Sequence, residues 1–169
     1  INQKLITRFH QRETLRISIN ATTPHDGFTP IETILHGHSR SSFGNAIRHE
    51  AEPGTLAFFG LIREYKGVPG LLRAFAAVSE PLRLSVAGNP SPPSLASEIS
   101  QLAAADDRVT LSLGHIPDAD LCELITAASL VVLPYREMHN SGAAITALSM
   151  NRPVLVPRNS APDTFAADV

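Results

Sequence analysis

Residues 55–88, TLAFFGLIREYKGVPGLLRAFAAVSEPLRLSVAG, contain the unit that decides the fold. An apolar run at residues 56–59 is followed by a charged loop, a segment with apolar residues at helical spacing, and a second apolar run at residues 82–87. Continuous apolar runs are typical of strands covered on both faces, and spacings of three and four residues are typical of amphipathic helices. The stretch therefore predicts a strand, a helix and a second strand.

The same alternation continues to residue 156. Further apolar runs lie at residues 109–113, 130–133 and 154–156, with helix-spaced segments between them. We expect Ser94 and Asp118 to cap two of these helices, because short oxygen-bearing side chains satisfy the free N–H groups of a helix start. Alternating strands and helices predict an α/β fold with a doubly wound, Rossmann-like parallel sheet of five strands and helices on both faces.

The first 54 residues do not follow this rhythm. Residues 15–19 and 31–35 are strand-like, and the segment between them has the composition of a loop. We interpret residues 1–35 as the tail of a preceding, mostly missing domain, 36–54 as an interdomain linker and 55–169 as the α/β domain, truncated at its C-terminus. Strands without partners tend to pair with another chain, so we expect mobility or self-association through residues 1–35.

Composition excludes several classes of protein. The chain of 169 residues carries 14 Lys and Arg against 16 Asp and Glu, a net charge of −2, which gives no electrostatic reason to expect nucleic acid. Cys122 is the one cysteine, so no internal disulfide can form, and this count fits a reducing, cytoplasmic setting. No apolar run approaches the length of a membrane span.

Two loops follow the strands at which the strand order is expected to reverse, where ligands bind in doubly wound sheets. The loop at residues 60–67 contains Arg63 and Lys66 beside a helix start, and such cations suit a diphosphate. The alternative is that both are solvated loop charges. The loop at residues 135–142 ends in Asn140, Ser141 and Gly142 before an alanine-rich helix, whose N-terminus suits a phosphate. Asn140 or Ser141 would also cap that helix.

Other chemistries are less well supported. The pair His36 and His38 has a two-ligand spacing, with His25, His115 and His139 as further candidates, but carboxylates and paired cysteines are missing around them. We therefore expect no metal site, and we expect Cys122 to be packed rather than reactive. A nicotinamide-dependent oxidoreductase is rejected because the first loop lacks the Gly-x-Gly-x-x-Gly pattern and no acid ends the second strand.

From about Ile31 to Val169 the chain resembles the C-terminal, donor-binding half of the retaining, family-four type of glycosyltransferase, which has two facing Rossmann-like domains (the GT-B fold). His36-Gly37-His38 and the Asn-Ser-Gly loop resemble the subgroup that builds bacterial exopolysaccharides and cell-surface glycans. The other matching pieces are Phe59-Gly60 through Lys66-Gly67, Leu84 to Gly88, Val109 to Ile116, Ala127 to Pro134, and Arg152-Pro153-Val154.

The resemblance implies transfer of a sugar from a nucleotide-diphosphate sugar to a glycan or glycolipid acceptor, which would lie against the missing domain. Lys66, with Arg63, would hold the donor diphosphate together with Ser141 and Gly142, and the backbone at His115 and Ile116 would meet the base. The sugar and ribose would meet Glu137, His139, Asn140 and Thr146. The resemblance implies no metal or other cofactor, and a cytoplasmic location, with the full-length protein at the inner face of the membrane.

The sequence departs from the family at several site positions. Leu61 stands where the family commonly has arginine, Thr146 stands where it has the ribose-binding glutamate, and the other glutamate aligns near Met138, beside Glu137. A threonine cannot make the bidentate contact of a carboxylate. The alternative function is therefore a non-catalytic module that binds a nucleotide sugar or a protein and kept the fold. We expect this chain alone to bind nucleoside diphosphate weakly and to transfer no sugar.

Overall fold

The computed structural model describes residues 16–18, 31–33, 49–136 and 141–157. The chain divides into two compact units, Ile1–Gly37 and His38–Val169. In the first unit, strands β1 (Arg16–Ser18) and β2 (Ile31–Thr33) pair in parallel. The strands predicted near these positions are therefore confirmed over these residues. Their assignment to a preceding domain stays a prediction, and the expected looser packing of residues 1–35 falls mostly outside the described residues.

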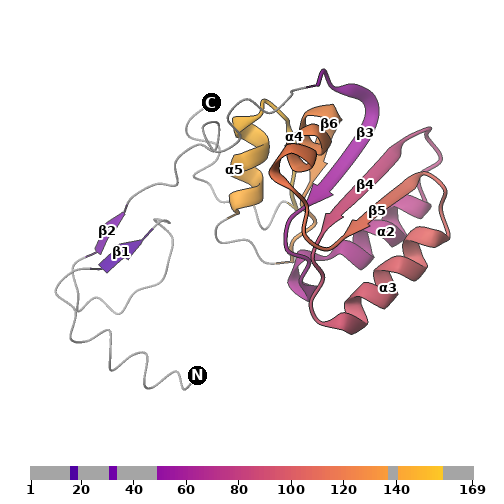
Figure 1. The fold of residues 1–169 in the computed structure, drawn as a ribbon, viewed down its shortest axis with the longest axis horizontal. Coiled ribbons are helices and arrows are strands. Elements are labelled where there is room, and N and C mark those ends of the chain that lie inside the picture. The colour runs from indigo at the N-terminus through magenta and orange to yellow at the C-terminus, as the bar shows by residue number, and fades with distance from the viewer. Residues whose placement is uncertain (1–15, 19–30, 34–48, 137–140, 158–169) are drawn as a thin grey trace. The chain divides into compact units, whose positions relative to one another are not determined.

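The second unit contains a parallel five-stranded sheet in the order β5-β4-β3-β6-β7 (Figure 1). Its strands are β3 (Glu52–Phe59), β4 (Arg83–Gly88), β5 (Val109–Leu113), β6 (Ala128–Val132) and β7 (Val154–Leu155). Every neighbouring pair is parallel, which confirms the predicted sheet. The first strand begins at Glu52, inside the predicted linker, because Glu52 already pairs with Ala128 of β6.

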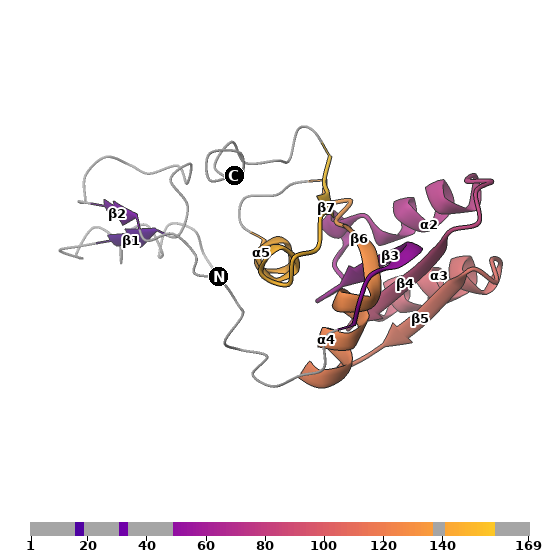
Figure 2. The ribbon, with the colours of Figure 1, turned by 90° about the horizontal axis from the view of Figure 1, so that it is seen from above.

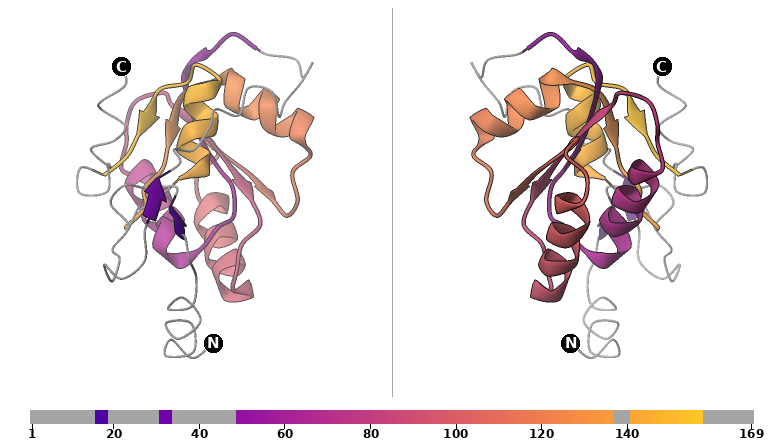
Figure 3. Two further views of the ribbon diagram at one scale, coloured as in Figure 1. Left: turned by 90° about the vertical axis from the view of Figure 1, so that its left-hand side faces the viewer. Right: turned by 90° about the vertical axis from the view of Figure 1, so that its right-hand side faces the viewer.

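Helices cover both faces of this sheet. They are α2 (Val68–Ala76), α3 (Pro93–Ala104), α4 (Asp118–Ala127) and α5 (Gly142–Ser149), preceded by the short 3₁₀ helix η2 (Glu64–Lys66). Figures 2 and 3 show α2 and α3 together on one face and α4 with α5 on the other. Right-handed crossovers require this arrangement, because the strand order runs one way from β3 to β5 and the other way from β3 to β7.

The predicted caps of two helices are wrong. Helix α3 starts after Pro92 and helix α4 after Pro117, and neither proline position has a side-chain cap hydrogen bond. Ser94 and Asp118 instead lie inside the first turn of their helices. Proline has no side-chain acceptor to offer, so the first N–H groups of both helices lack a side-chain cap. In α3 the next residue, Pro93, holds the first helical position, where its fixed φ angle and missing N–H suit a helix start. The Asp118 carboxylate lies at the positive end of the α4 dipole.

The core fixes the carboxyl ends of the central strands. Its largest fully buried side chains include Phe58, Leu84 and Ile125 from the sheet and the helix above it. Ile62 is also fully buried although it lies in the loop after β3, and its backbone exchanges hydrogen bonds with Asn89 and Ser91 after β4. The first part of that loop is therefore anchored. Cys122 is buried in the same core, which confirms that it is packed.

Candidate functional site

The two loops singled out in the sequence meet at the carboxyl ends of β3 and β6. These strands are adjacent in the sheet, and both loops leave the same edge. The N–H of Arg136 donates to the carbonyl oxygen of Tyr65 at 2.7 Å, which joins one loop to the other. Residues from distant parts of the sequence therefore lie side by side at the switch point, as the strand order predicts.

Glycines permit the close approach of backbone segments at this edge. Gly88 has a φ of +151°, and a Cβ atom there would lie 1.9 Å from the carbonyl oxygen of Gly60. Gly67 has a φ of +69° and lies between η2 and α2. Since L side chains rarely adopt such backbone conformations, these two positions favour glycine. The result is a compact platform in which the ends of β3, β4 and β6 touch.

Lys66 is the last residue of η2 and lies half-buried over this platform. Its Nζ atom is 5.0 Å from the centroid of the Tyr135 ring, a cation–π arrangement. Burial, and secondarily the charge of Arg63, lowers the pKa of the Lys66 ammonium. Within the described residues no carboxylate forms an ion pair with Lys66. Its charge is therefore available to an anion.

Arg63 and Arg136 add two exposed cations to the loops that meet at this edge. Arg63 immediately precedes η2 and is close enough to Lys66 to disfavour its charged form. Arg136 follows Tyr135 at the end of β6 and is tied by its backbone to Tyr65. Among the described residues neither guanidinium takes part in an ion pair. Arg63 was predicted from the sequence as a site residue, whereas Arg136, which lies beyond the end of β6, was not.

Ser141 caps helix α5, as one of the two sequence alternatives predicted. Its Oγ atom accepts a hydrogen bond from the N–H of Ala144 at 3.2 Å, and its side chain is buried. The N–H groups of Gly142 and Ala143 precede the first helical hydrogen bond and need acceptors from outside the helix. A Cβ atom on Gly142 would meet no described residue within 4 Å, so none of those residues covers the helix start. This open, positive helix end suits a phosphate.

Tyr135 links the lysine to the helix start. Its side chain is buried, with 3% of the residue exposed, and its ring packs edge-on against Tyr65 at 6.0 Å between centroids. Burial raises the pKa of the Tyr135 phenol, and the neighbouring Ser141 hydroxyl opposes that shift. No hydrogen bond of acceptable geometry reaches its hydroxyl from any described residue. Tyr135 was not predicted from the sequence, because an aromatic residue after an apolar run is typical of the hydrophobic core.

The remaining predicted site residues are spread more widely. His115 is exposed and Ile116 half-buried, both after β5 at the carboxyl edge, and Thr146 is half-buried on α5. Strand β4 separates β5 from β3, so His115 and Ile116 lie further along the edge than the two loops that meet. Glu137, His139 and Asn140 lie outside the described residues, as do Met138 and the histidines at positions 25, 36 and 38.

Metal ligands and membrane spans are both missing from the described part of the chain. No group of three or more His, Cys, Asp and Glu side chains is arranged to hold a metal ion there. In the same residues, no helix has both the length and the apolar character needed to cross a bilayer.

The fold and the cations at its edge define a class: a doubly wound α/β domain with positively charged side chains at its switch point. Residues 53–168 match the family model described as "Glycosyl transferases group 1". The chain therefore belongs to the group 1 glycosyltransferase family, as the resemblance implied.

Relatives agree with this assignment. The chain is 41% identical over 170 residues to the GDP-mannose:glycolipid 4-beta-D-mannosyltransferase of Xanthomonas campestris pv. campestris. That match covers 99% of this chain and 48% of the relative, so the chain spans about half the length of the curated relatives it matches.

Solved structures share the fold. HepE of Anabaena, crystallised in complex with UDP-glucose, superimposes with a TM-score of 0.73 at 14% identity, over 98% of this chain and 50% of that one. The C-terminal domain of the group 1 glycosyltransferase LpcC from Francisella tularensis gives a TM-score of 0.52 at 18% identity, over 68% of this chain and 66% of that one. At these identities the likeness concerns the fold, which is that of GT-B glycosyltransferases.

Proposed function

We propose that this chain is the donor-binding part of a glycosyltransferase that moves mannose from GDP-mannose to a glycan or glycolipid acceptor. The observation that carries the proposal is that Tyr135 lies between Lys66, whose ammonium stands over its ring, and Ser141, the N-cap of α5, at the edge where β3 and β6 end. The 41% identity to a GDP-mannose-dependent enzyme over nearly the whole chain favours guanine as the base and mannose as the sugar.

The chemistry of this edge fits a leaving nucleoside diphosphate. Breaking the bond between the sugar and the diphosphate leaves additional negative charge on the departing oxygen. Lys66 supplies a positive charge without a competing carboxylate among the described residues, and the N–H groups of Gly142 and Ala143 supply fixed donors. Preorganised donors of this kind stabilise developing charge without rearranging. No metal is needed in this scheme.

The remaining residue roles follow the resemblance. The backbone at His115 and Ile116 would hold the base, and Thr146 would lie near the ribose in place of a glutamate. The acceptor would lie against a second domain. The complete protein would work at the inner face of a bacterial membrane on a cell-surface glycan. Self-association through residues 1–35 remains a further proposal, testable by measuring the mass of the chain in solution.

Calorimetric titration of the chain with GDP, UDP and ADP tests donor binding. We expect weak binding of GDP, because this chain spans about half the length of its curated relatives, and still weaker binding of the other two nucleotides, because the relative at 41% identity is named for GDP-mannose. Failure of all three to bind would overturn the proposed function. A clear preference for UDP would retain the donor site and overturn only the choice of guanine.

Transfer is tested with the complete protein, GDP-α-D-mannose and a glycolipid acceptor. Turnover separates the enzyme from the non-catalytic module to which Thr146 points, because a module that only binds donor releases no GDP. The anomeric configuration of the product also decides stereochemistry. An α-mannoside means retention, as the resemblance implies, whereas a β-mannoside, for which the Xanthomonas relative is named, means inversion.

A further inference from the structure

Tyr135 combines deep burial with a hydroxyl that has no partner among the described residues. The residue is 3% exposed, and no described residue forms a hydrogen bond with its Oη atom. Buried polar groups are nearly always paired, because an unpaired one loses its hydrogen bonds to water without compensation. Such an exception beside a candidate site calls for an explanation, and a ligand that completes the pairing is a direct one.

The surroundings of this hydroxyl point to an anion. On one side, the Tyr135 ring lies under the Lys66 ammonium at 5.0 Å from ring centroid to Nζ. On the other side, Ser141 is close enough for its hydroxyl to oppose the rise in the pKa of Tyr135. The Ser141 Oγ atom already accepts from Ala144, and no geometric hydrogen bond joins it to Tyr135. Because Ser141 is the N-cap of α5, the Tyr135 hydroxyl lies near the start of that helix.

We propose that Tyr135 is a ligand-binding residue of this site: its hydroxyl donates a hydrogen bond to a phosphate oxygen of the bound nucleoside diphosphate, while its ring holds Lys66. The inference rests on the proposed function. It adds a residue that contacts Lys66 through its ring and lies near Ser141 through its hydroxyl. A phenol suits this task because it donates to an anionic oxygen without adding charge. The ring contributes by limiting where the ammonium can go.

The chain offers a matched pair of substitutions. It contains two tyrosines, Tyr65 and Tyr135, whose rings touch. Tyr135→Phe removes the buried hydroxyl and keeps the ring, and Tyr65→Phe makes the same chemical change at a residue that is 47% exposed. We expect Tyr135→Phe to weaken GDP binding about tenfold, the effect of losing one hydrogen bond to a charged group. We expect Tyr65→Phe to leave GDP affinity unchanged.

Two controls separate a ligand contact from a structural role. Tyr135→Phe should leave the melting temperature unchanged or raise it, because an unpaired buried hydroxyl disappears. Inorganic pyrophosphate should show the same weakening as GDP, whereas guanosine, which has no phosphate, should bind the parent and Tyr135→Phe alike. A loss of guanosine binding equal to that of GDP would overturn the phosphate contact.

Labelling with 3-fluorotyrosine gives a second measurement that does not depend on the folding of Tyr135→Phe. The two tyrosines give two ¹⁹F resonances, assigned by comparison with Tyr65→Phe. Addition of GDP should shift the Tyr135 resonance. If the parent binds GDP but Tyr135→Phe binds equally well and the resonance stays in place, the inference is overturned while the proposed function stands. If the parent binds no nucleoside diphosphate, the proposed function itself has failed.

Discussion

Gly67 and Pro134 touch backbone to backbone, although one precedes helix α2 and the other follows strand β6. A Cβ atom on Gly67 would lie 2.3 Å from the carbonyl oxygen of Pro134, and Gly67 has a φ of +69°. Since the obstacle is backbone, no side chain can rotate to relieve it. The contact holds the loop that carries Lys66 against the strand that leads to Tyr135.

Gly67→Ala should therefore damage both the fold and the site. A non-glycine residue in this conformation costs on the order of 1–3 kcal/mol before the steric clash is added. We expect a lower free energy of unfolding, measured by urea denaturation, and a loss of GDP binding. Gly70→Ala is the control, because Gly70 lies within α2 and a Cβ atom added to it would meet nothing within 4 Å. That change should stabilise the chain by about 0.5–1 kcal/mol.

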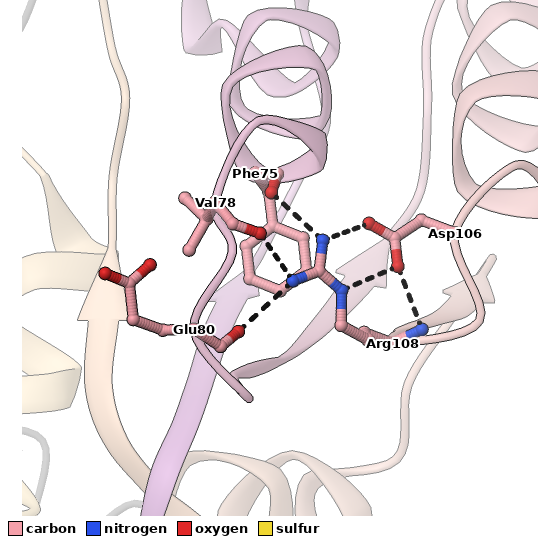
Figure 4. Close-up of polar contacts among 5 residues, drawn as sticks. All are labelled: Phe75, Val78, Glu80, Asp106 and Arg108. Carbon is pink, nitrogen blue, oxygen red and sulfur yellow. Dashed lines mark hydrogen bonds and ion pairs between the residues drawn. The ribbon is translucent and has the colours of Figure 1, made fainter.

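Arg108 supports the opposite end of the domain (Figure 4). Its guanidinium donates to the carbonyl oxygens of Phe75, Val78 and Glu80, and it binds the Asp106 carboxylate at 2.7 Å. The guanidinium also lies 4.7 Å from the centroid of the Phe75 ring. One side chain thus joins the end of α2 to the start of β5, where a cation also opposes the negative end of the helix dipole.

Arg108→Ala should lower the melting temperature more than Arg83→Ala does. Arg83 forms a pair with Glu52 at 2.8 Å, and both of those side chains are well exposed, so that pair is screened by water. Hydrogen bonds from Arg108 lower the pKa of Asp106, so their stabilisation is present above the pKa of an unfolded aspartate. It is lost as the pH falls through the lowered value. Equal melting temperatures for the two variants would contradict this role.

The fold was predictable because each strand is an apolar run of neighbouring residues in the sequence. Runs such as residues 130–133 are apolar throughout, since both faces of the central strands are covered, and no distant contact is needed to recognise them. Helix starts were less predictable. At Pro92 and Pro117, proline geometry replaced the side-chain caps expected from Ser94 and Asp118.

The site was predictable only in part. Topology alone brought Lys66 toward Ser141, because the rule for switch points depends on strand order. The part played by Tyr135 depends on burial and on an unpaired hydroxyl, and neither can be read from its neighbours in the chain. The carbonyl groups that Arg108 binds in Phe75 and Val78 likewise lie 30 or more residues away, so this part of its network could not be predicted from neighbouring residues.

The lowered pKa of Lys66 predicts how nucleotide binding responds to pH. Burial and Arg63 disfavour the ammonium in the free protein, so Lys66 loses its proton at a lower pH than an exposed lysine does. A bound phosphate favours the ammonium, and binding must then take up a proton once the pH exceeds the lowered pKa. GDP affinity should fall as the pH rises through that value. Tyr135 does not interfere, because burial raises the pKa of its phenol and keeps it neutral.

Calorimetry between neutral and alkaline pH, in buffers of different ionisation enthalpy, measures this proton uptake. Lys66→Arg is the matched variant, since a guanidinium keeps its charge over the whole range. Its GDP affinity should be nearly independent of pH. A parent protein whose affinity is equally flat would show that Lys66 does not contact the anion.

Removal of the individual cations tests the diphosphate assignment itself. Lys66→Ala should weaken GDP binding by about one to two powers of ten, because a hydrogen bond to a charged group contributes roughly 1.5–3 kcal/mol. Arg63→Ala should act in the same direction if Arg63 supplies the charge that the family places at the position of Leu61. Leu61→Arg should tighten binding, because Leu61 is 56% exposed and a guanidinium there meets no steric obstacle from the core.

Arg73→Ala is the control for a general loss of positive charge. Arg73 lies on α2 and binds Glu98 of α3 at 2.6 Å, so it is a cation already engaged elsewhere. Its removal should leave GDP affinity close to that of the parent. Lys66→Ala and Arg63→Ala should keep a melting temperature near that of the parent, because neither side chain forms an ion pair within the described residues. Titration of the five proteins with GDP tests the assignment. Equal affinities for the parent, Lys66→Ala and Arg63→Ala would show that the donor diphosphate does not bind at this edge of the sheet.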